Sequence, residues 1–592
     1  MKWIALLQRW LLWSAYGLDL VMAAPVRYRL TWDTPPRYTY HVEVEASPSK
    51  GKHTDFSLPA WRPGRYILQN YAGAVSHFSA YDGEGKPLPW RKVTKDTWRV
   101  QNPSRGSIRV QYRFYAKQID AGSSYLSEGL VYLNPVNLLV YIPGRLEEPC
   151  ELEIVSLPDG WDVATALPRQ SHRRFSARDY HQLVDCPVLA APHLLSYTTS
   201  CEELTLHVHF WGRVGAKSLA PFVEDLCKII RVQKAIWGNK LPLSEYHFMY
   251  LLVPFQLRHA VEHETSAMFV LPEEGAASEE ALKSFLGISA HEFFHVWNVK
   301  RLRPAALWPY RYDKECYTSL HWLTEGVTDY YTTLTLLRAG ILSPEEYWKR
   351  LSTELSQIEN GFAYQLFSPA ELSVDSWLAN SSYRPSHFQG SFYAAGKRVG
   401  FLLDMVLRRE TKGKVTLDSL LRYLYSQYYE KGKGIPEDGV EKAAVRLGGA
   451  ALRSFFARYV WGKESPIYEE LLDGLPLRVH RERHILREWG CIGLSRVRSE
   501  GEGLRVEEIL PGSLAERAGI EIGDILLTVG EQSVRDLPPD YWEKTLLGAR
   551  LLLGWSREGF PMEKEILLTP EAASYRVEVH LTPTEPGFLL DF

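Results

Sequence analysis

The sequence predicts a multidomain α+β protein in which a mainly helical region lies between two β-rich regions. Three observations support this fold class. The chain has 592 residues, which is too long for a single hydrophobic core. Short segments rich in Val, Tyr, Thr and Ile fill residues 26–200, and short strands are expected again from about residue 479. Between them, in residues 220–461, the apolar side chains mostly recur at helical spacing.

Composition restricts the class of protein and its partners. Apolar residues make up 45% and charged residues 23% of the chain, as is usual in globular proteins, and the formal net charge is −3. The charges form no basic stripe, so we expect no nucleic-acid partner. The six cysteines show no Cys-x-x-Cys spacing, which argues against a cysteine-ligated metal and against a dense disulfide framework. The sequence leaves the oligomeric state open.

The first 24 residues are the only candidate for a targeting segment. Basic residues precede an apolar run from Trp10 to Leu18, and small residues lie near Ala24, but Asp19 and Pro25 disfavour a cleavage site. Cytoplasmic and exported (periplasmic or secreted) locations therefore both stay open. The apolar run is short for a bilayer and no other segment approaches its length, so we expect no stable membrane span.

Residues 25–198 are predicted to form an N-terminal β-sandwich. Pro, Gly and Asp separate the strand-like segments, as expected where strands end in turns. A sandwich is the expected arrangement because a sheet must bury one face against a second layer. The expected strands cover residues 26–32, 38–45, 107–115 and 151–155.

Residues 199–478 are predicted to form a mainly helical domain. Ser278 ahead of two glutamates indicates a helix start, and Gly340 indicates a helix end. A basic run ahead of Pro304 is expected to lie at the end of the second helix. The expected helices cover residues 219–237, 279–299, 320–339, 344–358 and 394–410.

The second of these helices contains the segment His291-Glu292-Phe293-Phe294-His295. Residues four apart share one face of a helix, so one metal ion can contact both imidazoles. Glu292 follows the first histidine and is close enough to hold a water molecule beside the metal. In this arrangement two histidines bind zinc and the glutamate acts as general base.

A catalytic zinc site needs a third protein ligand, and Glu325 is the candidate. Its surroundings are apolar, and a carboxylate buried there would need a partner such as a metal. Asp329 is expected on the same helix face, where it could accept a hydrogen bond from a ligand histidine and fix its orientation. The alternative for both is an exposed acidic helix edge. His321 also shares this face, but the sequence favours a core or supporting role for it over a ligand role.

Three segments of the chain resemble the glycyl aminopeptidase family of zinc metallopeptidases. They are residues 291–304, residues 325–331 and Pro59-Ala60-Trp61-Arg62-Pro63-Gly64-Arg65-Tyr66. The third segment is similar to a signature of that family's N-terminal β domain. The resemblance implies a thermolysin-like catalytic domain, one Zn²⁺ ion per chain, peptide substrates and aminopeptidase activity. It also implies a PDZ domain at the C-terminus.

The resemblance suggests two substrate-binding residues upstream of the zinc helix, Glu262 and its neighbour His263. In related aminopeptidases a glutamate at this place binds the free α-amino group of the substrate. The chain departs from the family's usual glycine pair, since Ala260 and Val261 stand there, so the preferred first residue stays open. The alternative is an ordinary strand with a solvated Glu262.

The resemblance also assigns Tyr393 to catalysis, as a hydroxyl donor to the oxyanion of the tetrahedral intermediate. Such a donor contributes about 10²–10³ in rate. The family's usual lysine two residues later is Ala395 here, although Lys397 lies nearby. A packing role for Tyr393 is the alternative.

Residues 479–592 are predicted to form the PDZ domain, on the resemblance of the stretch from Gly512 to Asp524. Its carboxylate-binding loop would consist of Cys491, Ile492, Gly493 and Leu494. Such domains bind peptide C-termini by adding a strand to a sheet edge. The module could present substrate, regulate the peptidase or pack against it.

The function predicted from these residues is a zinc metallopeptidase, and within that class an aminopeptidase that releases small N-terminal residues of the Gly or Ala type. One alternative is an endopeptidase or a PDZ-directed processing protease. Another, from a different class, is a PDZ-based peptide-binding protein with an inactive peptidase scaffold.

Overall fold

The computed structural model describes residues 24–214, 219–273, 278–385, 388–538, 541–545, 548–585 and 587–589. The candidate targeting segment therefore lies, except for Ala24, outside the described residues. The chain divides into two compact units. The first comprises Met1–Arg62 and Asn70–Leu194, and the second comprises Pro63–Gln69 and Leu195–Phe592. Among the helices of the described residues, none has both the length and the apolar character that crossing a membrane requires.

The first unit is built from strands, as predicted. Its sheets have the orders β12-β10-β1-β2-β7-β4, β11-β13-β9-β8 and β3-β6-β5. Two short helices, α2 (Pro135–Leu138) and α3 (Tyr180–Val184), connect strands. The strands are β1 (Val26–Thr31), β2 (Thr39–Ala46), β3 (His53–Ser57), β4 (Val75–Asp82), β5 (Trp90–Thr94), β6 (Thr97–Gln101), β7 (Ile108–Tyr115), β8 (Tyr125–Ser127), β9 (Leu130–Leu133), β10 (Cys150–Ile154), β11 (Asp162–Ala164), β12 (Arg174–Ala177) and β13 (Val188–Ala191).

Side chains of this unit alternate between core and surface, because successive residues of a strand point to opposite faces. In β2, Tyr40, Val42 and Val44 are buried and the residues between them are more exposed. Phe78 of β4 stacks on Trp98 of β6 with ring centroids 5.1 Å apart, so the six-stranded sheet packs on the three-stranded one. This is the layered β-rich domain that the sequence predicts.

The second unit begins with a five-stranded sheet of order β14-β15-β16-β18-β17, which the sequence analysis did not predict. β16 and β18 are buried at nearly every position, so their side chains show no polar alternation. A short, wholly apolar run does not distinguish a buried strand from a buried helix. The strands are β14 (Leu195–Cys201), β15 (Leu204–Trp211), β16 (Glu245–Val253), β17 (His259–Glu262) and β18 (Ser266–Pro272).

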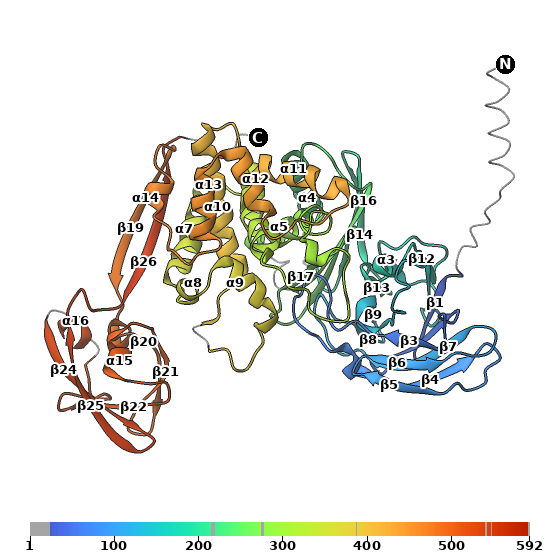
Figure 1. The fold of residues 1–592 in the computed structure, drawn as a ribbon, viewed down its shortest axis with the longest axis horizontal. Helices are drawn as coiled ribbons and strands as arrows, with labels where there is room; N and C mark the ends of the chain where they lie inside the picture. Colours follow the sequence, from blue (N-terminus) through green and yellow to red (C-terminus); the bar gives the residue numbers. More distant parts are fainter. Residues whose placement is uncertain are drawn as a thin grey trace. The chain divides into compact units, whose positions relative to one another are not determined.

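Helices α4 (Ala220–Ile236) and α5 (Glu279–Phe294) cover one face of this sheet (Figure 1). Leu206 and Phe248 of the sheet belong to the same core as Leu226 of α4 and Phe293 of α5. The predicted N-cap of α5 is confirmed, since Ser278 Oγ accepts a hydrogen bond from the third residue of the helix. A disulfide between the end of β14 and α4, Cys201–Cys227, links sheet and helix.

Helix α5 ends at Phe294, five residues before the predicted end. The chain continues in hydrogen-bonded turns, in which the N–H of Lys300 donates to the carbonyl of His295 and that of Leu302 to Trp297. These five-residue spacings are wider than an α-helix uses. The basic run therefore lies in turns after the helix rather than within its last turn.

The predicted helix at residues 320–339 consists of two parts, a π-helical turn η4 (Trp322–Val327) and helix α6 (Thr328–Arg338). η4 packs closely on helix α10 (Phe392–Thr411) through two glycines. A Cβ atom on Gly326 would overlap the backbone of Gly396, and one on Gly396 would overlap the carbonyl of Trp322. Only glycine fits such an approach of two backbones.

Helix α10 packs against α6, α7, α9, α11, α12, α13 and α14. The predicted helix at residues 344–358 is α7. It begins with a capping box formed by Ser343 and Glu346. The helices are α7 (Pro344–Asn360), α8 (Ala363–Leu366), α9 (Pro369–Val374), α11 (Leu417–Gln427), α12 (Gly439–Gly448), α13 (Ala451–Tyr459) and α14 (Tyr468–Leu471).

The C-terminal region is a small sheet of order β20-β21-β22-β24-β25 joined to a two-stranded ribbon, β19 and β26. The ribbon runs beside α7 (Figure 1). Backbone N–H groups of β26 donate to Ser352 Oγ (3.0 Å), Ser356 Oγ (2.8 Å) and Asn360 Oδ1 (2.7 Å) of that helix. The elements are β19 (Leu477–Ile485), β20 (Leu494–Glu500), β21 (Gly503–Ile509), α15 (Leu514–Ala518), β22 (Ile525–Val529), β23 (Gln532–Ser533), α16 (Tyr541–Thr545), β24 (Ala549–Arg557), β25 (Phe560–Leu568) and β26 (Tyr575–Pro583).

Candidate metal centre and active site

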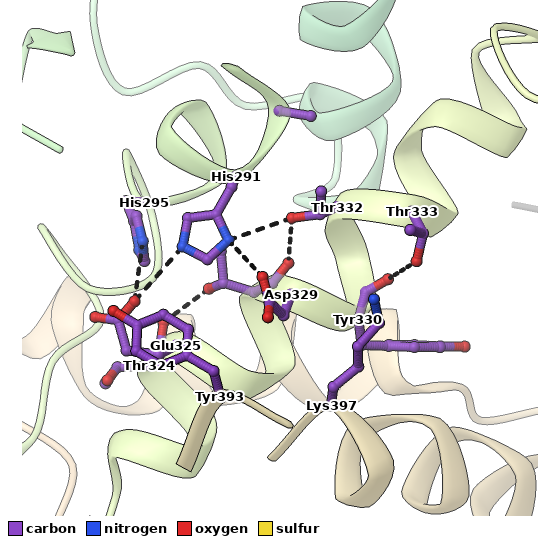
Figure 2. Close-up of polar contacts among 12 residues, drawn as sticks. His291, His295, Thr324, Glu325, Asp329, Tyr330, Thr332, Thr333, Tyr393 and Lys397 are labelled. Atoms are coloured by element: carbon purple, nitrogen blue, oxygen red, sulfur yellow. Dashed lines mark hydrogen bonds and ion pairs between the residues drawn. The ribbon is translucent and has the colours of Figure 1, made fainter. Parts of the chain in front are cut away.

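Three proposed ligands lie together between α5 and η4. The Nε2 atoms of His291 and His295 lie 3.6 Å and 3.3 Å from Glu325 Oε2. One possible ligand atom of each residue lies within 4.8 Å of those of the other two. Figure 2 shows both imidazoles turned toward this carboxylate. The spacing of four residues places both histidines on one side of α5, and the π-helical turn η4 supplies the carboxylate of Glu325.

Glu325 is buried, so it does not belong to an exposed acidic helix edge. Burial alone would raise the pKa of this carboxyl, but His295 and His291 outweigh that effect and hold its pKa well below the usual range. Its Oε1 atom is buried without a hydrogen-bond partner among the described residues. Two imidazoles around one ionised, partly unsatisfied carboxylate form the N/O donor set that zinc uses in catalytic sites.

The outer ring nitrogens of both histidines have oxygen partners. His291 Nδ1 lies 2.9 Å from Asp329 Oδ1 and 3.4 Å from Thr332 Oγ1. His295 Nδ1 lies 2.6 Å from the carbonyl oxygen of Asn298 and, as an N–H, donates to it. Such contacts fix which nitrogen of each ring faces the metal position. Asp329 lies where the sequence analysis expected a partner for a ligand histidine (Figure 2).

Glu292 is buried beside these histidines. Its carboxylate, that of Glu262 and the imidazole of His295 form a second group whose ligand atoms lie within 4.8 Å of one another. Burial raises the pKa of Glu292 to about 7, against the opposing effect of His291 and His295. A carboxyl group with this pKa takes up and releases a proton near neutral pH, as a general base must.

Glu262 is the last residue of the edge strand β17 and is buried, so it is not a solvated strand residue. Its Oε1 atom has no hydrogen-bond partner within the part of the chain that the structure describes. Gly64, in a left-handed conformation with φ of 79°, approaches the carboxylate so closely that a Cβ there would overlap it. The next residue, His263, is also buried, and its backbone N–H donates to the carbonyl of Ser266 at 2.8 Å.

The two residues that replace the family's glycine pair have different surroundings. Val261 pairs with Met268 of β18, and Glu262 pairs with Ala267, so the two side chains point to opposite faces of the sheet. Val261 is therefore directed away from the carboxylate of Glu262. Ala260 shares the face of Glu262 and borders the same cavity as His291 and Glu292.

Tyr393 lies at the start of α10, with its ring centroid 6.1 Å from that of His291 (Figure 2). Burial, together with Glu325 and Glu262, raises the pKa of its hydroxyl well above the usual value, so the hydroxyl keeps its proton. Lys397, one turn further along α10, pairs with Glu354 of α7 at 2.6 Å and borders the cavity of His291. It also contributes to the lowered pKa of Asp329.

His321 lies outside the ligand group. Its ring packs on Tyr66 with centroids 3.7 Å apart, and its Nδ1 lies 3.3 Å from Thr324 Oγ1. Burial lowers the pKa of His321 to about 4, so the ring is neutral at neutral pH. These contacts fit the core or supporting role that the sequence analysis favours for it.

Two cavities border the site. One of about 770 Å³ is lined by His291, Glu292, Asp329 and Ala260. The other, of about 730 Å³, is lined by Gly64, Tyr66 and Tyr393, and His259 borders both. The catalytic candidates therefore lie between two spaces, each large enough for part of a peptide.

Three family descriptions match successive parts of the chain. The Peptidase M61 N-terminal domain matches residues 27–192, M61 glycyl aminopeptidase matches residues 284–399, and the PDZ domain matches residues 505–541. The chain carries both domains of the M61 peptidase family. It is accordingly a zinc metallopeptidase of the aminopeptidase class, with a PDZ domain at its C-terminal end.

One solved structure has a similar fold, and a second is a more distant match. An aminopeptidase N family protein from Idiomarina loihiensis is 24% identical, with 95% of this chain and 99% of that chain covered and a TM-score of 0.81. An M1 zinc metallopeptidase from Deinococcus radiodurans, a mutant bound to a Tyr-Ser-Ala substrate, is 16% identical. The match covers 75% of this chain and 95% of that chain, with a TM-score of 0.49. No curated protein sequence matches the chain significantly.

Two features of this M61 site were missed in the sequence. The segment Pro63–Gln69 lies within the match to the M61 N-terminal domain, yet in the structure it belongs to the second unit, where Gly64 and Tyr66 line the site. The glycine pair of η4 and α10 was also not recognised. Gly326 directly follows Glu325, and Gly396 follows Tyr393 by three residues, which is the signal that could have revealed their contact.

The predicted carboxylate loop of the PDZ domain lies ahead of the edge strand β20. Cys491 and Ile492 end the short helix η8 (Glu488–Ile492) with buried side chains. Gly493 follows in a left-handed conformation with φ of 94°, and Leu494 begins β20. The loop therefore leads directly into a strand that has only one neighbour, β21, in its described sheet.

Proposed function

We propose that this M61-type peptidase removes small N-terminal residues, of the Gly or Ala type, from peptides. The observation that supports this best is the buried carboxylate of Glu262, whose ligand atom lies within 4.8 Å of those of Glu292 and His295. A carboxylate at this place attracts the protonated α-amino group of a substrate. It thereby positions the first peptide bond of a chain, and no internal one, at the general base.

The residues present fit one Zn²⁺ ion held by His291, His295 and Glu325. The unsatisfied Oε1 of Glu325, noted above among the described residues, supports this assignment, as do the oxygen partners of both outer ring nitrogens. When bound, the ion supplies a Lewis acid that polarises the scissile carbonyl and acidifies the attacking water.

The chain's own residues then divide the proton transfers. Glu292 takes a proton from the water as it attacks and passes it to the leaving amine, for which its pKa of about 7 is suitable. Tyr393, whose hydroxyl keeps its proton, donates a hydrogen bond to the oxyanion that develops on the scissile carbonyl. Asp329 holds the imidazole of His291 in orientation.

The preference for a small first residue rests on Ala260. Its side chain lies on the same face of β17 as Glu262 and borders the cavity that contains His291 and Glu292. A methyl group in place of the family's hydrogen narrows that space. Val261, directed to the opposite sheet face, does not contribute to this effect.

The test compares alanyl- and glycyl-arylamides with their N-acetylated counterparts. We expect hydrolysis of the free amines only, and a loss of about 10- to 100-fold in kcat/KM in Glu262→Gln, because hydrogen bonds to charged groups contribute about 1.5–3 kcal/mol. Glu264→Gln is the matched control, since Glu264 pairs with Arg301 at 3.6 Å instead. Cleavage of the acetylated substrates would identify an endopeptidase. Absence of all hydrolysis would favour a peptide-binding protein with an inactive scaffold.

For the PDZ domain we propose binding of peptide C-termini at Cys491, Ile492, Gly493 and Leu494. Support comes from the position of this loop ahead of the edge strand β20, which offers its backbone for strand addition. Fluorescence polarisation should detect binding of peptides with a free C-terminal carboxylate. Equal binding of the C-terminally amidated peptides would contradict this proposal.

A further inference from the structure

A second histidine cluster lies on the five-stranded sheet of the second unit. His207 and His209 are two residues apart on β15, so their side chains project from the same face. His247 lies on the neighbouring parallel strand β16, directly paired with His207. Three imidazoles thus project from one small area of one sheet face.

This face is not the one that packs on the helices. Leu206 and Val208, which alternate with the histidines along β15, belong to the core that includes α4 and α5. The histidines therefore point away from that core, and the catalytic His291 and His295 lie on its helical side. The side chains of His207 and His247 are 19% and 10% exposed, so the cluster is partly shielded and still reachable from solvent.

The three rings are close enough to share one ion. A possible ligand atom of each lies within 4.8 Å of those of the other two. His209 Nε2 lies 3.4 Å from His247 Nδ1, so these two rings are in contact. The rings of His207 and His247 stack with centroids 4.5 Å apart.

Hydroxyl groups on the adjacent strand β14 orient two of the rings. Thr198 Oγ1 lies 3.0 Å from His207 Nδ1, and Ser196 Oγ lies 2.9 Å from His209 Nδ1. When each Nδ1–H donates to its hydroxyl, the lone pair of each Nε2 is directed into the cluster. Histidines that bind metals almost always donate their other ring N–H to an oxygen in this way.

A carboxylate completes the group. Glu245 Oε1, at the start of β16, lies 2.8 Å from His207 Nε2 and 3.4 Å from His247 Nε2. This side chain is 56% exposed, so it can move to meet an ion without opening the sheet. Three imidazoles and one carboxylate make a complete set of four donors.

We propose that His207, His209 and His247 bind a second divalent transition-metal ion, with Glu245 as fourth ligand. Imidazole nitrogen favours Zn²⁺, Cu²⁺ and Ni²⁺ over the oxygen-seeking Mg²⁺ and Ca²⁺, and Zn²⁺ accepts this tetrahedral N₃O set. The ion would cross-link β15 and β16 by side chains. The full chain would then hold two ions, one more than the sequence analysis predicts.

The first test counts bound zinc by mass spectrometry of the full chain after reconstitution with Zn²⁺ and removal of the excess. We expect two ions in the wild type, one in the double variant His207→Gln and His209→Gln, and one in the double variant His291→Gln and His295→Gln. The matched control changes His480 and His580 to Gln, an exposed cross-strand pair with ring centroids 6.3 Å apart, and should keep two ions. A wild type with one ion, lost only in the α5 variant, would overturn the proposal.

A second measurement decides the matter even if the sheet variant fails to fold. Co²⁺ is added to the variant that lacks His291 and His295, and the visible absorption of tetrahedral Co²⁺ is recorded. We expect this spectrum at one equivalent and its loss when His247→Gln is added. A spectrum that is absent at the start, or that persists after His247→Gln, would refute the sheet site. Neither result depends on peptidase activity, so the proposed function stands or falls separately.

Discussion

The second unit contains two clusters with similar donors on different frameworks. His291 and His295 lie on one helix and meet Glu325 from a π-helical turn, whereas His207 and His209 lie on one strand and meet His247 from the next. In both clusters the ligand atoms lie within 4.8 Å of one another. In both, a ring nitrogen contacts an oxygen at 2.9 Å, from an Asp in one and a Ser in the other.

The difference lies in what surrounds the donors. The helical cluster has Glu292, Glu262 and Tyr393 beside it and borders cavities that can take a peptide. Beside the sheet cluster lie the hydroxyl groups of Ser196 and Thr198 and the exposed carboxylate of Glu245. Donor atoms alone therefore do not determine whether a metal site is catalytic. A general base and a place for substrate do.

The largest expected effect on activity comes from replacing a carboxylate beside the helical cluster, and the same replacement beside the sheet cluster should have none. Glu292→Gln removes the proposed general base without changing the size of the side chain, and general base catalysis contributes about 10²–10⁴ in rate. We expect kcat on alanyl-arylamides to fall by that factor while zinc content stays unchanged.

Glu245→Gln is the matched change at the sheet cluster and should leave hydrolysis at the wild-type rate. Metal analysis of both variants shows whether an activity loss comes from a lost ion instead. If Glu292→Gln kept wild-type kcat, its role as base would be wrong. If Glu245→Gln lowered kcat as much, the sheet cluster would belong to the catalytic site.

A smaller effect concerns the orientation of His291. Asp329→Asn replaces a charged partner 2.9 Å from Nδ1 by a neutral amide. Changes to such partners cost about 10–100-fold in metal affinity or activity. We expect a 10- to 100-fold weaker zinc affinity in competition with a chelator, and Thr333→Ser on the same helix should change nothing. Unchanged affinity in Asp329→Asn would show that Thr332, at 3.4 Å, orients the ring by itself.

The contact between η4 and α10 predicts an effect on stability. In Gly396→Ala the added methyl group would overlap the carbonyl of Trp322, so the backbone that carries Glu325 must move. Overpacking of this kind costs about 1–3 kcal/mol. Thermal denaturation should show a lower Tm, with zinc affinity reduced at the helical cluster only. Gly73→Ala, at a glycine without positive φ where nothing lies within 4 Å of the added Cβ, controls for the general cost of replacing a glycine.

The same two clusters show what the sequence reveals. A spacing of four residues on a helix brings His291 and His295 together within one element, so the sequence alone reveals this motif. Glu325 was predicted as a ligand from its apolar sequence surroundings. His207 and His209 alternate with apolar residues on a strand, and their third partner comes 38 residues later through strand pairing. No local pattern encodes that pairing, and the sheet that carries it was not predicted.

Long-range contacts also limited the prediction of the helical cluster. Helices α4, α7 and α10 were predicted within a few residues because their apolar spacing and caps are local properties. The end of α5 at Phe294 and the π-helical turn at Glu325 depend on tertiary packing, so periodicity alone placed them in longer regular helices. The approach of Gly64 to Glu262 joins residues nearly two hundred positions apart and has no local signal.

The smallest expected effect is at the sheet cluster, where Ser196→Ala removes the neutral partner 2.9 Å from His209 Nδ1. A hydroxyl orients a ring less strongly than the carboxylate of Asp329 does, since hydrogen bonds to charged groups are about twice as strong as neutral ones. We therefore expect a several-fold loss of Co²⁺ affinity at the sheet site, measured in the variant that lacks His291 and His295. Ser200 lies on the same strand, and its hydroxyl donates to the carbonyl of Glu202 at 2.9 Å. Ser200→Ala should therefore leave the Co²⁺ affinity unchanged. A loss as large as that at Asp329 would mean that orientation by a neutral hydroxyl is as effective as orientation by a charge.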